Sequence, residues 1–155
     1  MSVLAAIRPD DWNFPLLLHV LGAMLLVGGL VTAITALYLG WRRDAYPFSR
    51  FGFWTLLLVA FPSWWLMRLA GEWIRSREGF GAEGSEDPAW LGIGYITAEA
   101  GGLLLLISII LTGIGQRRAR TGGGPSNLVR VGTVLATVVL AAYILAMWAM
   151  TAKPD

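Results

Sequence analysis

The chain has 155 residues, of which 56% are hydrophobic and only 14% are charged. Soluble domains carry about 25% charged residues, so this composition indicates a membrane protein. A spanning helix needs about 20 mostly apolar residues, which leaves no room for a separate soluble catalytic domain. The absence of cysteine excludes thiol–disulfide chemistry and cysteine-bound metal centres, and a single histidine excludes a multi-histidine metal site within one subunit.

Four long apolar segments follow one another along the chain, at residues 14–41, 51–74, 89–115 and 131–152. Each is long enough to cross a hydrocarbon core of about 30 Å as a helix, and hydrocarbon offers no other partner for backbone hydrogen bonds. The first segment lacks a basic leader and a cleavage pattern, so we expect it to be a retained span. The sequence therefore predicts an all-α, polytopic four-transmembrane-helix bundle that forms one transmembrane domain over residues 1–155.

Local features of these segments predict how the helices pack. Pro62 lies inside the second segment and is expected to kink it. The other three segments carry small residues at four-residue spacing, which lets lipid-embedded helices approach closely. In the third segment these are Gly94, Ala98 and Gly102. Such faces suit a compact bundle, and one of them is available for a homo-oligomer.

The arginines lie mainly in two of the three connections. Residues 42–50 carry Arg42, Arg43 and Arg50 against one acid, and residues 116–130 carry four arginines and no acid. Because basic loops stay on the cytoplasmic side, we expect both of these loops to be cytoplasmic and both termini to be extracytoplasmic, in the plasma (inner) membrane. The topology of the chain in a lipid bilayer thus accounts for its basic residues. The bilayer is the expected partner, and no nucleic acid is expected.

A few ionisable side chains lie inside the predicted spans, where a charge is costly and functional roles are common. Counted from the outer helix ends, they all fall in the outer half of the bilayer. Tyr143 adds a phenol at a similar level. We therefore predict a ligand- or proton-binding site, with no catalytic or metal-binding residue assigned, formed by His19, Arg68, Glu72, Glu99 and Tyr143.

The charges within this group are expected to be coupled. Arg68 and Glu72 are four residues apart, so their side chains can meet, and Trp64 and Arg75 extend the same helical stripe. One arginine would then face the carboxylates of Glu72 and Glu99, so that either His19 takes a proton or Glu99 keeps one. A simpler interpretation stays open, in which Arg68 and Glu72 pair at the outer interface and His19 bonds a nearby carbonyl.

The sequence leaves the cofactor unknown, with haem and quinone as candidates. His19 with Met147 or Met150 would give His/Met haem ligation, and two copies of His19 in a dimer would give bis-His ligation. A quinone or lipid would suit the tryptophan-rich second span together with His19 and Arg68.

Two short segments carry a resemblance to a known family. They are Leu18-His19-Val20-Leu21-Gly22-Ala23 with Val27-Gly28-Gly29, and the closing Met150-Thr151-Ala152-Lys153-Pro154. Together they resemble bacterial four-helix integral-membrane proteins akin to the copper-resistance D-type membrane domain. The resemblance implies a helical bundle with a histidine near the outer surface, and only His19 matches it. Copper-handling relatives would be expected to hold further histidines, which this chain lacks.

The sequence leaves three classes of function open. The first is a non-catalytic integral membrane protein with a polar ligand- or proton-binding site, serving as an accessory subunit of a larger redox or transport assembly. The second is a small ion or proton channel or transporter that works as an oligomer. The third is a membrane enzyme that acts on a lipid or a quinone.

Overall fold

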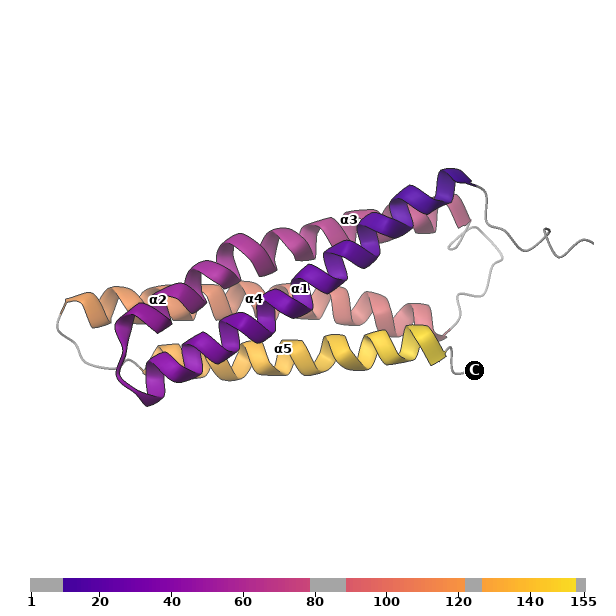
Figure 1. Cartoon of the computed structure of the whole chain (residues 1–155). Helices are drawn as coiled ribbons and strands as arrows, with labels where there is room; N and C mark the ends of the chain where they lie inside the picture. The colour runs from indigo at the N-terminus through magenta and orange to yellow at the C-terminus, as the bar shows by residue number, and fades with distance from the viewer. Residues whose placement is uncertain (1–9, 79–88, 122–126, 153–155) are drawn as a thin grey trace, which may run out of the picture.

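The computed structural model describes residues 10–78, 89–121 and 127–152, which are helical except at two short turns (Figure 1). The prediction of four helices long and apolar enough to cross a membrane is confirmed, at Phe14–Arg42, Tyr46–Arg77, Leu91–Arg120 and Asn127–Ala152. The second of these is built from three consecutive elements. In chain order the elements are α1 (Asp10–Arg42), α2 (Tyr46–Thr55), the π-helical η2 (Leu56–Ala60), α3 (Phe61–Glu78), α4 (Ala89–Arg120) and α5 (Asn127–Ala152).

The helices extend beyond the apolar segments that predicted them. The predicted loop 42–50 is reduced to a turn at residues 43–45, and α2 begins at Tyr46 with Pro47 in its first turn, where no amide hydrogen is needed. In the predicted loop 116–130, α4 continues to Arg120 and α5 starts at Asn127. Arginine forms helix well and is favoured in a last helical turn, so polar turns can prolong an apolar helix.

The irregularity expected at Pro62 takes the form of a π-helical turn directly before it. The amide of Phe61 donates to the carbonyl of Leu56, five residues earlier, instead of the usual four. Proline has no amide hydrogen, and its ring collides with the carbonyl four residues earlier in a regular α-helix. The wider π turn accommodates both effects while the helix continues into α3.

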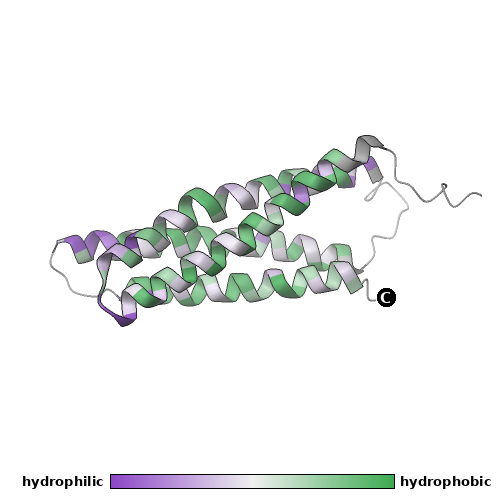
Figure 2. Ribbon diagram, viewed as in Figure 1, coloured by the Kyte–Doolittle hydropathy of each residue, from purple (hydrophilic) through white to green (hydrophobic). Residues whose placement is uncertain are grey.

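The helices form two antiparallel hairpins. α1 packs along α2, η2 and α3, and α4 packs along α5, while α1 crosses the bundle diagonally from α3 at one end to α5 at the other (Figure 1). The beginning of α1 and the end of α5 therefore lie at the same end of the molecule. We call this the site end. The opposite end, where hydrophilic residues gather in Figure 2, we call the arginine end.

Within each hairpin, glycines allow the backbones to approach closely. A Cβ atom at Gly22 of α1 would lie 2.6 Å from the backbone nitrogen of Met67, and one at Gly132 of α5 would lie 3.1 Å from the carbonyl oxygen of Ser108. The buried Ser108 hydroxyl donates to the Gly132 carbonyl over 2.7 Å. The small residues thus hold α1 to α3 and α4 to α5, and large apolar side chains fill the space between the hairpins, among them Leu26, Leu30, Leu56, Leu105 and Val139.

Candidate functional site

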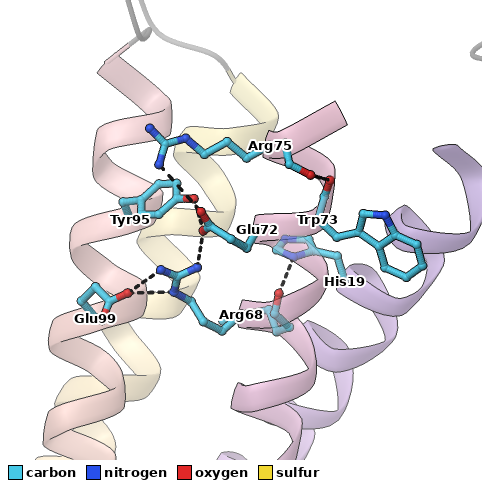
Figure 3. A network of polar contacts seen from close by, with 9 residues as sticks. His19, Arg68, Glu72, Trp73, Arg75, Tyr95 and Glu99 are labelled. Atoms are coloured by element: carbon cyan, nitrogen blue, oxygen red, sulfur yellow. Dashed lines mark hydrogen bonds and ion pairs between the residues drawn. The ribbon is translucent and has the colours of Figure 1, made fainter. Parts of the chain in front are cut away.

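Polar side chains connect α3 to α4 near the site end. α3 presents Trp64, Arg68, Glu72 and Arg75 at spacings of four, four and three residues, which places them on one helical face. This face points to α4 (Figure 3). Because α4 runs antiparallel to α3, the partners appear in reverse order along it. We call the connected set the polar ladder, and it consists of Trp64, Arg68, Glu72, Arg75, Tyr95 and Glu99.

Arg68 is the centre of the ladder because it bonds carboxylates from two helices. Its Nε donates to Glu99 Oε1 over 2.7 Å, and its Nη2 lies 2.7 Å from the same oxygen. Its Nη1 donates to Glu72 Oε2 over 2.6 Å. Hydrogen bonds between two ionised groups are the short and strong kind in proteins. Arg68 therefore joins α3 to α4 and at the same time neutralises charge in its own helix.

Tyr95 of α4 lies between two guanidinium groups. The Cζ atoms of Arg68 and Arg75 are 5.0 Å and 4.7 Å from the centre of its ring, and its hydroxyl donates to Glu72. Both distances are in the range of cation–π attraction. The ring thus keeps two like charges apart while its hydroxyl holds the carboxylate that faces them.

The ladder contains two arginines and two carboxylates. Arg75 Nη1 lies 4.0 Å from Glu72 Oε1, so two arginines accompany the carboxylates of Glu72 and Glu99. Arg68 bonds both carboxylates, as expected, and Arg75, one turn beyond Glu72 on the same face of α3, adds a second positive charge.

Trp64 of the ladder and Tyr143 of α5 both approach one carbonyl of α4, toward the middle of the bundle. Trp64 Nε1 donates to the carbonyl of Ala98 over 2.9 Å, and the buried Tyr143 hydroxyl lies 3.5 Å from the same oxygen. Both rings rest against glycines of α4, since a Cβ at Gly101 would be 2.9 Å from the Tyr143 hydroxyl and one at Gly102 would meet the Trp64 ring. Tyr143 therefore packs next to Glu99 without bonding it.

His19 lies apart from the ladder. Its Nδ1 is 2.9 Å from the carbonyl oxygen of Met67, and since a carbonyl only accepts, Nδ1 carries the hydrogen. The ring packs against Gly71 on the side of α3 that faces α1, away from Glu99 (Figure 3). The structure thus brings Arg68, Glu72 and Glu99 together. His19 instead bonds a nearby backbone carbonyl, which is the simpler of the two interpretations of this residue.

Three members of the ladder were not among the predicted site residues, although the sequence placed two of them, Trp64 and Arg75, on the same helical stripe as Arg68 and Glu72. Tyr95 precedes Glu99 by four residues, and Arg75 follows Glu72 by three, so both lie within one helical turn of a predicted carboxylate. That spacing is the signal that could have identified them. Both lie close to a predicted helix end, where tyrosine and arginine are also common as interfacial residues.

The ladder presents its carboxylates outward and holds Arg68 inward. The side chains of Glu99 and Glu72 are 61% and 49% exposed, whereas that of Arg68 is 23% exposed. Both bonds to Glu99 end on Oε1, and among the described residues no group donates to its Oε2. The exposed surface of the ladder therefore offers hydrogen-bond acceptors with negative charge. It is suited to a ligand that brings donors and positive charge.

The described ranges contain no group of three or more histidine, cysteine, aspartate or glutamate side chains that could hold a metal ion. The chain matches no protein-family model, no curated protein and no solved structure, so the chemistry of the polar ladder rests on its own residues.

Proposed function

We propose that this protein is a membrane-embedded binding protein that takes the cationic, hydrogen-bond-donating headgroup of an amphiphile on Glu99 and Glu72. One observation carries the proposal: Glu99 is exposed on the outside of the bundle with one carboxylate oxygen free of any donor from the described residues. A carboxylate oxygen that has no donor is costly near hydrocarbon. A primary ammonium group supplies three donors and the opposite charge.

Helix lengths support a position of the ladder at the edge of the hydrocarbon core. About 17 residues separate Gln116 from Glu99 in α4, which is about 25 Å of helix. About 18 residues separate Arg50 from Arg68, or about 27 Å. If the hydrocarbon begins at the arginine end, a core of about 30 Å ends close to Arg68 and Glu99. The carboxylate then meets headgroups on one side and acyl chains on the other.

The face of α4 that carries Glu99 is otherwise apolar and exposed. Ile96, Leu103 and Ile110 lie on this face, with 72%, 59% and 50% of each residue exposed. They stand three residues before and four and eleven residues after Glu99, which is the repeat of one helical face. A hydrocarbon tail can lie along this face while its headgroup reaches the ladder. This arrangement favours an amphiphile over a small water-soluble ligand.

We place the arginine end in the cytoplasm of a plasma (inner) membrane, because arginines concentrate there. The ladder then opens toward the outer leaflet, and both termini are extracytoplasmic. In this orientation the chain acts without catalysis as an accessory subunit that holds an amphiphile for a larger redox or transport assembly.

The proposal is tested with dodecylamine as the probe. Its binding to the protein in phosphatidylcholine nanodiscs is measured by equilibrium dialysis of the radiolabelled amine, with protein-free nanodiscs subtracted. A charge-assisted hydrogen bond contributes about 1.5–3 kcal/mol. Glu99→Gln should therefore weaken dodecylamine binding about tenfold or more. Dodecanol, which has a similar tail and no charge, should bind much less than the amine.

Asp44→Asn is the matched control, since it removes one negative charge from the arginine end instead. Asp44 has a φ of 51°, a backbone conformation that asparagine tolerates well, so this variant should fold and bind dodecylamine like the wild type. Circular dichroism checks that both variants are helical. Equal affinity of the wild type and Glu99→Gln, or binding of dodecyl sulfate as tight as that of the amine, would overturn the proposal.

A further inference from the structure

The arginine end carries a cluster of positive charge that the amphiphile site does not use. The ends of α1 and α4 and the beginnings of α2 and α5 meet there, and the arginines on them are all exposed. Asp44 is the one acidic residue in this part of the sequence. We call the set the arginine collar, and it consists of Arg42, Arg43, Arg50, Arg117, Arg118, Arg120 and Arg130.

The collar differs from the polar ladder in how its charges are accompanied. Arg68 in the ladder bonds two carboxylates, whereas no described carboxylate forms an ion pair with any arginine of the collar. Two collar arginines lie against aromatic rings, Arg42 over Tyr38 at 5.8 Å and Arg130 over Trp41 at 4.7 Å. A ring contact fixes the direction of a guanidinium and leaves its edge donors available. The collar therefore presents oriented donors without an internal counter-ion.

Contacts between helix ends keep these arginines close to one another. A Cβ at Gly115 of α4 would lie 3.0 Å from the backbone nitrogen of Val129 in α5, and the buried Gln116 side chain donates to the carbonyl of Ser49 in α2. Arg130 and Trp41 add a contact between α5 and α1. All four helix ends are thus tied together, and their arginines gather at one end of the molecule.

We propose that the arginine collar binds the phosphodiester headgroups of anionic phospholipids in the adjacent leaflet, with Arg130 on Trp41 as its best-oriented donor. The planar guanidinium matches two phosphate oxygens at once. A tryptophan at the helix end lies at the depth of the headgroups, which brings its arginine to the phosphate level. Basic clusters next to a spanning helix attract anionic lipids by the same physics. This site is separate from the amphiphile site and does not depend on it.

The test uses nanodiscs that contain equal amounts of phosphatidylglycerol and phosphatidylcholine. The protein is released from them by native mass spectrometry, and the lipids that remain bound are counted by class. The wild type should retain phosphatidylglycerol over phosphatidylcholine, by about fivefold for each engaged arginine at low ionic strength. This enrichment should fall as salt is added. Arg130→Gln should reduce it about fivefold, and the triple variant Arg117→Gln/Arg118→Gln/Arg130→Gln should reduce it about a hundredfold.

Arg77→Gln is the matched control, because Arg77 also lies over a tryptophan, 5.6 Å from the centre of the Trp73 ring, but at the site end. It removes the same charge and should leave the enrichment unchanged. Equal retention of both lipids by the wild type would overturn the proposal, even if no variant folded. Enrichment that is undiminished in the folded triple variant would overturn it too. Displacement of the lipid by millimolar inorganic phosphate would overturn the assignment to a lipid and assign a soluble phosphate instead.

Discussion

At the scale of single residues, Arg68 is the group on which the polar ladder depends. It bonds Glu72 within α3 and Glu99 in α4, and it lies against the ring of Tyr95. Removal of either carboxylate leaves the arginine with the other one. Removal of the arginine leaves two carboxylates, with Arg75 near one of them. Substitution of Arg68 should therefore reduce stability much more than substitution of either carboxylate.

We predict that Arg68→Met destabilises the protein by about 2 kcal/mol or more, because the carboxylates of Glu72 and Glu99 lose the donors of Arg68. Glu99→Gln should cost about 1 kcal/mol, since an amide oxygen still accepts from Arg68. Unfolding by sodium dodecyl sulfate, followed by circular dichroism in detergent micelles, measures both. In the Glu99→Gln background the cost of Arg68→Met should fall, which reports the coupling of the pair. Equal costs in the two backgrounds would show that these residues act independently.

The sequence predicted the meeting of Arg68, Glu72 and Glu99 correctly because two simple quantities control it. Four-residue spacing placed Arg68 beside Glu72, and depth counted from the helix ends placed Glu99 at the same level. The position of His19 could not be found in this way. It depends on the rotation of α1 about its own axis, and a helix that is apolar on all sides gives no pattern from which that rotation can be derived.

At the scale of elements, glycines decide which helices form a hairpin. Gly22 and Gly28 both lie in the apolar sequence of α1, yet their surroundings differ. A Cβ at Gly22 would lie 2.6 Å from the backbone of Met67, whereas a Cβ at Gly28 has nothing within 4 Å. The first glycine is therefore required by the contact between α1 and α3, and the second faces outward.

We expect the alanine substitutions at these positions to have opposite effects. The methyl group added by Gly22→Ala pushes the backbone of α1 away from α3. The substitution should destabilise the protein by about 1–3 kcal/mol, as overpacking does. Gly28→Ala adds a favourable helix former in open space and should stabilise it by up to about 1 kcal/mol. The same detergent unfolding assay compares them, and each serves as the control for the other. A similar loss in both variants would contradict the close packing of α1 on α3.

The sequence also indicated where the second span departs from a regular helix, although it did not specify the form. Pro62 identifies the place, because any proline inside a helix removes one hydrogen bond. Whether the helix bends or inserts a π turn depends on the contacts that the residues around and after the proline make with neighbouring helices. Here Ala60 lies against Gly29 of α1, and Trp64 must reach Ala98 of α4. Such long-range contacts cannot be derived from the local sequence.

At the scale of the whole molecule, the two ends have different charge patterns and different chemistry. The arginine collar has no described carboxylate partner, while the ladder at the site end balances its charges internally. A molecule with this polarity has one preferred orientation in a membrane, because translocation of several arginines is disfavoured. The orientation in turn decides which leaflet would supply the proposed amphiphile and which would supply the proposed anionic lipid. One measurement of sidedness therefore bears on both proposals.

The absence of cysteine makes that measurement direct, since each introduced thiol is the single reactive one. Ser76 lies at the site end and Thr121 at the arginine end, and both are exposed. In intact spheroplasts, a membrane-impermeant maleimide should label the Ser76→Cys variant and leave the Thr121→Cys variant unlabelled, because we expect the arginines to stay in the cytoplasm. After permeabilisation both variants should be labelled to the same extent, which confirms that each thiol is accessible. Labelling of Thr121→Cys alone in intact spheroplasts would reverse the orientation. The amphiphile would then have to come from the inner leaflet, and the collar would face a surface that positive charge normally avoids.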